Sequence, residues 1–154
     1  MKATDILKKQ HREVEGLFKK VEKAEGAEDR RQLMEQIKMS LEAHTTIEEE
    51  IFYPAIAELE TKKACEMVNE AFEEHHVVKL VLKELPSVDP EDERFEAKMT
   101  VLSELIEHHV EEEEKEMFKL AEKIEKEEAD DIAQRMQTRF EELIGQHGRR
   151  SKAA

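Results

Sequence analysis

Four histidines and two glutamates stand where the apolar pattern of this chain calls for an inward-facing residue. His11, for example, lies between Leu7 and Val14 at the spacing of three and four residues that marks one face of a helix. The same pattern selects a set of six candidate metal ligands: His11, His44, Glu48, His75, His109 and Glu113. Imidazole nitrogens and carboxylate oxygens bind transition metals, whereas a buried carboxylate without a cation is costly. These residues therefore predict a metal site inside a helical core.

Two of the histidines are each followed four residues later by a glutamate. His44 precedes Glu48, and His109 precedes Glu113. Residues at this spacing lie one above the other on a helix, about 6 Å apart, so both can reach one small centre. Such spacing is common by chance in a glutamate-rich chain, and the inward phase is what makes it informative. One or two metal ions would satisfy all six candidate groups together.

The candidate ligands recur in an internal repeat. An offset of 64 residues brings His11 onto His75, and an offset of 65 brings His44 onto His109 and Glu48 onto Glu113. A doubled helical hairpin places its two His/Glu sets on opposite sides of one centre. The repeat therefore predicts a frame for two metals bridged by two carboxylates.

The elements that position these residues are long helices with few breakers, since the chain has only 4 glycines and 3 prolines. Apolar periodicity, capping residues and breakers predict helices at about Thr4–Gly26, Asp29–Leu59, Thr61–Leu85, Asp89–Lys126 and Ala129–Ile144. Pro54 should kink the second helix, and Gly145 should end the last. The predicted fold class is all-α: an antiparallel up-and-down four-helix bundle with an additional C-terminal helix over residues 1–145, followed by a basic disordered tail at 146–154.

Charge and composition exclude several classes of partner. The chain carries 25 Lys and Arg against 39 Asp and Glu, a formal charge of −14. This negative field repels phosphate backbones and anionic lipids, so we expect no nucleic-acid and no membrane partner. The single cysteine, Cys65, cannot form an internal disulfide, and no apolar leader is apparent, which together favour a cytoplasmic location. No pattern predicts an oligomer.

The order of motifs resembles that of the hemerythrin-like (HHE cation-binding) family. His11, then His44-Thr45-Thr46-Ile47-Glu48, then His75, then His109-Val110-Glu111-Glu112-Glu113 match its H, HxxxE, H, HxxxE signature over residues 5–120. The resemblance implies a non-haem di-iron centre of two iron ions with an oxo or hydroxo bridge. It implies that His11, His44, His75 and His109 are terminal ligands and that Glu48 and Glu113 bridge the irons.

The chain departs from the oxygen-carrying members of that family. Lys79 stands where they have a fifth histidine, and Glu113 and Glu114 stand where they have an aspartate. More open coordination favours binding or turnover of small oxidants (O₂, H₂O₂ or NO), including catalase- or peroxidase-like activity with an unknown reductant, over reversible oxygen carriage. Tyr53, Glu49 and Glu112 are candidates for the vacant position, although each is off the inward phase.

Other functions remain compatible with the sequence. Iron storage, or iron or oxygen sensing without turnover, would use the same ligands. A metal-free helical interaction bundle would require the motif glutamates to lie on the surface. A ferritin-like oxidase is disfavoured, because it would need Glu-x-x-His motifs on the inward face and the only such spacing, Glu73 to His76, lies on a polar face.

Overall fold

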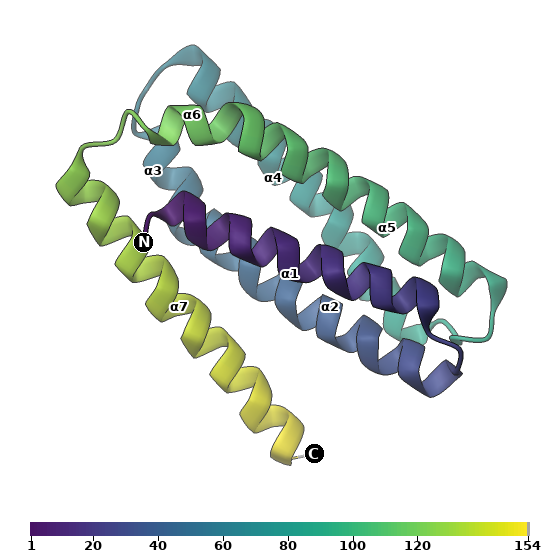
Figure 1. Ribbon diagram of the computed structural model, residues 1–154. Coiled ribbons are helices and arrows are strands. Elements are labelled where there is room, and N and C mark those ends of the chain that lie inside the picture. Colours follow the sequence, from purple (N-terminus) through teal and green to yellow (C-terminus); the bar gives the residue numbers. More distant parts are fainter. Residues whose placement is uncertain (154) are drawn as a thin grey trace.

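The fold consists of long helices joined by short turns (Figure 1). The computed structural model describes the backbone of residues 1–153 and the side chains of residues 1–148, and this part of the chain contains no strand. The elements, in order, are α1 (Ala3–Lys23), α2 (Ala27–Ile47), η1 (Glu48–Phe52), α3 (Tyr53–Ala57), α4 (Lys62–Glu84), η2 (Leu85–Ser87), α5 (Glu93–Glu112), η3 (Glu113–Met117), α6 (Phe118–Ala121) and α7 (Lys126–Ala153). The predicted all-helical class is confirmed.

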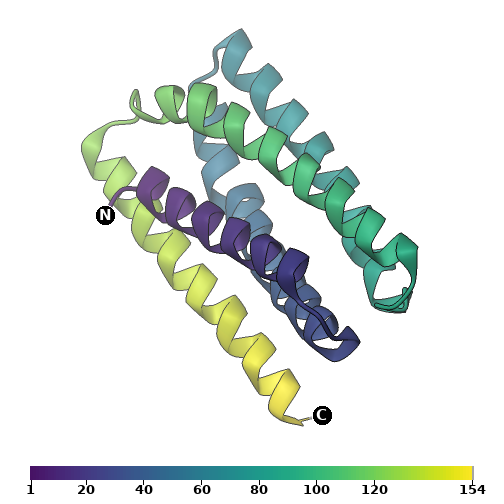
Figure 2. The same ribbon diagram turned by 45° about the vertical axis from the view of Figure 1, so that its right-hand side comes forward.

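Helices α1, α2, α4 and α5 lie side by side around a shared apolar interior, and α7 runs along the outside of α1 and α2 (Figures 1 and 2). One apolar cluster, which includes Met34, Phe95 and Leu102, fills the end of the bundle near the α1–α2 turn. A second cluster, which includes Phe52 and Ile132, lies where α3, α6 and the start of α7 meet. The site residues lie between these two clusters.

The start of α5 lies later than the sequence predicted. Asp92, rather than Asp89, is the N-cap, because its carboxylate accepts a 2.9 Å hydrogen bond from the backbone N–H of Arg94. Asp89 instead accepts from the backbone N–H of Glu91 and forms a local turn. The predicted boundary was therefore early by about one helical turn.

Two short π-helical segments interrupt the long helices, and each begins at the glutamate that ends an HxxxE motif. The N–H of Tyr53 donates to the carbonyl of Glu48, and the N–H of Phe118 donates to that of Glu113, five residues back in each case. The expected irregularity at Pro54 thus lies one turn earlier, at Glu48–Phe52. One extra residue per turn rotates every later side chain by about 100° relative to the α-helical pattern.

The C-terminal part also differs from prediction. The helix containing His109 ends at Ala121 rather than near Lys126, and α7 starts at Lys126, earlier than Ala129. It then continues through Gly145 to Ala153. Gly145 does not have the positive φ of a helix-ending glycine, so its predicted role was wrong. Of the predicted tail 146–154, Ala154 and the side chains beyond Gly148 lie outside the described part.

No helix within residues 1–153 combines the length and the apolar character needed to cross a lipid bilayer.

Candidate metal centre

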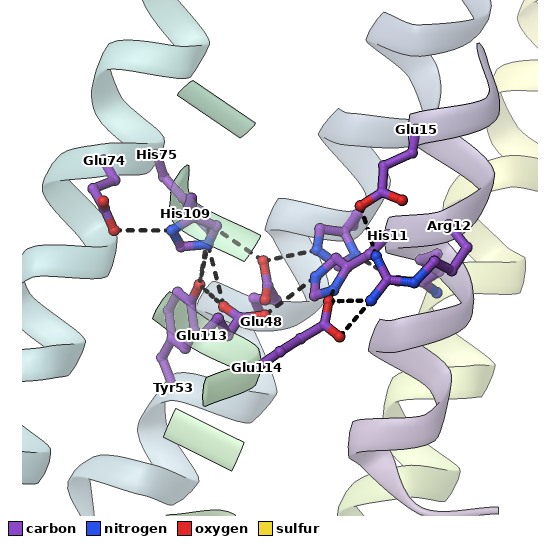
Figure 3. Close-up of polar contacts among 12 residues, drawn as sticks. His11, Arg12, Glu15, Glu48, Tyr53, Glu74, His75, His109, Glu113 and Glu114 are labelled. Atoms are coloured by element: carbon purple, nitrogen blue, oxygen red, sulfur yellow. Dashed lines mark hydrogen bonds and ion pairs between the residues drawn. The ribbon is translucent and has the colours of Figure 1, made fainter. Parts of the chain in front are cut away.

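The six predicted ligands converge in the interior of the bundle, although they come from six different elements. Figure 3 shows His11, Glu48, His75, His109 and Glu113 among them. All six are buried: His11 on α1, His44 on α2, Glu48 at the start of η1, His75 on α4, His109 on α5 and Glu113 at the start of η3. Glu48 is 0% exposed and Glu113 is 2% exposed. Two carboxylates in such a place require compensating positive charge.

Each glutamate spans the two halves of the repeat. Glu48 Oε1 lies 3.1 Å from His44 Nε2 and 3.2 Å from His75 Nε2. Glu113 mirrors it, with Oε1 3.3 Å from His11 Nε2 and Oε2 3.2 Å from His109 Nε2. A carboxylate that reaches a histidine of each hairpin has the placement of a bridging ligand.

The donor atoms form two groups of metal-site dimensions. His11, His44, Glu48 and Glu113 each offer one ligand atom within 4.8 Å of the others, and Glu48, His75 and His109 do the same. Glu48 belongs to both groups. The ring centroids of His11 and His44 are 4.9 Å apart, and those of His75 and His109 are 4.8 Å apart. The arrangement therefore offers one pair of imidazoles to each of two neighbouring positions.

The outer nitrogen of every site histidine faces an oxygen acceptor. The Nδ1 contacts are Glu114 to His11 at 3.0 Å, Gln10 to His44 at 2.6 Å, Glu49 to His75 at 2.9 Å and Glu74 to His109 at 2.9 Å. Because these oxygens accept, each Nδ1 carries the proton and donates. The inner Nε2 is then the nitrogen whose lone pair is available to a metal once it is deprotonated.

Tyr53 belongs to the site, contrary to the prediction that it is off the inward phase. Its side chain is 0% exposed, and its hydroxyl donates a 2.7 Å hydrogen bond to Glu113 Oε2. The hydroxyl oxygen of Tyr53 also lies 3.1 Å from both His75 Nε2 and His109 Nε2. The π-helical turn before Tyr53 rotates the residue inward, which a simple α-helical period cannot show. The His11/His44 pair marks the first half-site of the centre, and the His75/His109 pair marks the second. The residue equivalent to Tyr53, at an offset of 65, is Phe118, which stacks on His11 in the first half-site with ring centroids 6.3 Å apart.

Lys79, at the position of the family's fifth histidine, does not enter the centre. Its side chain is half exposed, and its ammonium lies 2.6 Å from Glu49, the partner of His75. In the other half, the guanidinium of Arg12 lies 2.6 Å from the carboxylate of Glu114, the partner of His11. Glu49 therefore acts on the outer side of His75, whereas Glu112 lies on the rim of the bundle, 3.4 Å from the exposed His108.

Electrostatics in the site favour histidine cations beside carboxylate anions. Burial lowers the pKa of His109, but hydrogen bonds with Glu113 and Glu74 outweigh burial and raise that pKa well above its usual value. Burial also lowers the pKa values of His11 and His75, but their hydrogen bonds with nearby glutamates outweigh it, so both pKa values are raised. Burial raises the pKa of Glu113, yet its hydrogen bonds to the surrounding groups hold that pKa well below the ordinary value.

Several buried atoms of the site lack a hydrogen-bond partner. These atoms are His11 Nε2, both carboxylate oxygens of Glu48 and Glu113 Oε1. Contacts of 3.1 to 3.3 Å exist around them, but without hydrogen-bond geometry. Such orphaned donors and acceptors are rare in protein interiors, and within residues 1–148 the one other buried side-chain atom of this kind is Arg30 Nε. The residues present therefore fit a pair of metal cations.

A small cavity of about 20 Å³ adjoins the histidine side of the centre. Its walls include all four site histidines, and apolar side chains such as Val14, Val78 and Ile106 close the rest of it. This volume is enough for about one water-sized molecule. A ligand of one or two non-hydrogen atoms can be accommodated there, whereas a larger organic substrate cannot.

Sequence reasoning brought out the six candidate ligands but not their outer partners. Gln10 and Glu74 directly precede His11 and His75, and Glu49 and Glu114 directly follow Glu48 and Glu113. Their position beside a ligand in both halves of the repeat was an available signal. Which histidine each one holds depends on contacts between helices, so it was visible only in the structure.

The chain belongs to the hemerythrin HHE cation binding domain family, whose model matches residues 2–121. A crystal structure of a hemerythrin HHE cation binding domain-containing protein from Mycobacterium kansasii, a homolog of Rv2633c, superposes with a TM-score of 0.82. It is 26% identical in sequence, and the match covers 95% of this chain and 89% of that one. A buried His/Glu cluster able to bind metal within a hemerythrin-like helical fold is therefore established for this chain.

Two sequence relatives differ in length. The uncharacterized protein Rv2633c of Mycobacterium tuberculosis is 27% identical over 148 residues, which are 94% of this chain and 89% of that protein. A DNA nickase of Nostoc is 24% identical over 118 residues, or 77% of this chain. This chain matches only 33% of the nickase's length, so the similarity covers one part of a larger protein.

Proposed function

We propose that this chain is a non-haem di-iron protein that binds or reacts with small oxidants at the centre described above, within an antiparallel up-and-down bundle. In this proposal, His11 and His44 hold one iron and His75 and His109 hold the other, each through Nε2. Glu48 and Glu113 would be shared between the two ions, because each contacts a histidine from both hairpins. Two iron ions supply redox chemistry, since each can exchange one electron between its ferrous and ferric forms.

The protein contributes ligand orientation. Glu114, Gln10, Glu49 and Glu74 fix the four imidazole rings by accepting from Nδ1, which keeps each Nε2 directed at the centre. Outer partners of this kind raise ligand basicity and hold the tautomer, and their loss costs about 10- to 100-fold in metal affinity. Arg12 and Lys79 in turn hold two of these carboxylates from the surface.

The centre is asymmetric because Tyr53 has Phe118 as its counterpart. The hydroxyl of Tyr53 is close enough to His75 and His109 to add an oxygen donor to the second half-site only. We assign Tyr53 as the additional ligand there, in place of the histidine that Lys79 replaces. The first half-site, bounded by the apolar Phe118 ring, keeps fewer protein ligands.

The single observation that carries the choice of substrate class is the cavity of about 20 Å³ lined by the four histidines. It admits molecules the size of O₂, H₂O₂ or NO and excludes larger substrates. The apolar walls limit water around the centre and give a small neutral molecule a favourable environment.

A cavity-filling substitution tests this proposal. Val78→Leu adds a methylene at the cavity wall, and Val68→Leu adds the same group at a buried position away from it. We expect both iron-loaded variants to keep two irons, while Val78→Leu slows H₂O₂ decomposition, measured with an oxygen electrode, relative to Val68→Leu. Equal rates in the two variants and the parent protein would contradict a reaction in this cavity.

A further inference from the structure

A second group of metal-binding side chains lies on the surface between α4 and α5. Glu74, His108 and Glu112 each offer one ligand atom within 4.8 Å of the other two. His108 Nε2 is 3.6 Å from Glu74 Oε2 and 3.4 Å from Glu112 Oε1. A divalent metal with ligands at about 2 Å holds its donor atoms at separations of this size.

This surface cluster connects to the buried centre through a pocket of about 30 Å³. Glu74, Glu112 and the exposed Glu70 line the outer part of the pocket, and His109 and Glu113 line its inner part. Glu113 is fully buried, and its Oε1 has no hydrogen-bond partner. Met67, Ala71 and Met117 complete the lining, so the pocket joins three acidic side chains at the surface to the buried carboxylate of Glu113. A cation could follow this row of carboxylates inward.

Glu74 joins the two sites through one carboxylate. Its Oε1 accepts from His109 Nδ1 at 2.9 Å, and its Oε2 faces His108. Among the side chains of residues 1–148, no Lys or Arg forms an ion pair with Glu70, Glu74 or Glu112. The cluster therefore keeps its negative charge available, and the net charge of −14 further attracts cations.

The internal repeat shows that this surface is special to one half of the molecule. At offsets of 64 and 65, Glu74 corresponds to Gln10, His108 to Ala43 and Glu112 to Ile47. Ala43 and Ile47 are buried, and α7 packs against their helix, α2 (Figure 2). The first half is thus covered, whereas the α4–α5 side carries ligand-type residues exposed to solvent.

We propose that Glu74, His108 and Glu112 form a surface site for a divalent first-row transition metal ion, which passes from there through the Glu113-lined pocket into the core. Water completes the coordination, because His108 and Glu112 are 63% and 45% exposed. The transfer step rests on the proposed metal centre, while surface binding does not depend on it.

Manganese binding tests the surface site. Iron-loaded protein is titrated with Mn²⁺, and free Mn²⁺ is measured by electron paramagnetic resonance. We expect one further Mn²⁺ per chain, bound at least about 10- to 100-fold more weakly in His108→Ala and Glu112→Gln, since loss of a ligand should cost no less than loss of an outer partner. His76→Ala and Glu111→Gln, at exposed positions outside the cluster, should bind as the parent does. Unchanged binding in His108→Ala and Glu112→Gln would overturn the site.

Iron uptake tests the transfer step. Metal-free protein is mixed with Fe²⁺ without oxygen, and protein-bound iron is measured over time. We expect His108→Ala and Glu112→Gln to fill more slowly than the parent but to reach the same final content. Equal rates would overturn the transfer step. The variant Glu48→Gln changes the core but leaves the surface cluster intact, so Mn²⁺ binding in that variant supports the surface site. If the core of the parent protein takes up no iron, that result contradicts the proposed function alone.

Discussion

The hydroxyl of Tyr53 donates a 2.7 Å hydrogen bond to Glu113 Oε2, although 60 residues separate the two in the chain. The π-helical segments that begin at the glutamates of the two HxxxE motifs make this contact possible. One segment rotates Tyr53 into the core, and the other begins at Glu113 itself. An irregular helical turn is thus part of how the fold builds the site.

Replacing Tyr53 with phenylalanine should leave Glu113 Oε2 without its hydroxyl donor. We expect the metal-free variant to lose about 1–3 kcal/mol of unfolding free energy, the usual cost of an unsatisfied buried acceptor. Denaturant unfolding of the two metal-free proteins measures this difference.

The same variant tests Tyr53 as a ligand. Tyr53 is the only tyrosine in the chain, so a tyrosinate-to-iron absorption band in the ferric protein can arise from no other residue. Tyr53→Phe should remove that band while two irons remain bound. A parent protein without such a band would contradict coordination by Tyr53, whereas the stability effect would stand.

Glu113→Gln should reduce the iron content to one or none per chain. The amide keeps the shape of the side chain but removes the charge that faces both half-sites. Glu111→Gln is the matched control, because Glu111 is exposed and lies two residues away. Elemental analysis of the two variants, prepared identically, measures the difference. Two irons in Glu113→Gln would show that this carboxylate is not a bridging ligand.

Gln10→Ala should weaken iron binding without removing a ligand. The amide oxygen accepts a 2.6 Å hydrogen bond from His44 Nδ1, and its loss frees the ring to rotate. We expect a loss of about 10- to 100-fold in iron affinity, measured by competition with a chelator. Gln36→Ala, at an exposed position on α2, controls for the loss of an amide side chain. Equal affinities in the two variants would argue against an orienting role for Gln10.

The metal-free protein should lose stability as the pH rises above neutrality. The pKa values of His11, His75 and His109 are raised from 6.5, so their contribution is complete below pH 6.5 and is lost as the pH rises through the folded values. The pKa of Glu113 is lowered from 4.5, so its contribution is present above pH 4.5 and is lost on acidification. Thermal unfolding with a chelator should therefore give a higher midpoint at pH 6 than at pH 9.

Iron should reverse this dependence. Binding through Nε2 requires the histidines to be neutral, so protons compete with the metal and iron binds more tightly at higher pH. The iron-loaded protein should then gain stability over the metal-free form as the pH rises from 6 to 8. If the thermal unfolding midpoint of the metal-free protein does not decrease as the pH is raised from 6 to 9, the histidine–carboxylate pairing described above is contradicted.

The sequence was enough to predict the convergence of His11, His44, Glu48, His75, His109 and Glu113, because apolar phase and the repeat depend on local periodicity. It was not enough for Tyr53, since a π-helical turn changes that period within one turn. The start of α5 at Asp92 rather than Asp89 reflects competition between two capping residues. The partners Gln10 and Glu74 depend on helix packing, which a pattern along one helix does not encode.

The metal content per chain tests the central claim most directly. Protein produced with ample iron and desalted in air should contain about two irons per chain by elemental analysis, and Glu48→Gln prepared in parallel should contain fewer. A single zinc ion, or no metal, in the parent protein would contradict a di-iron centre formed by these histidines and glutamates.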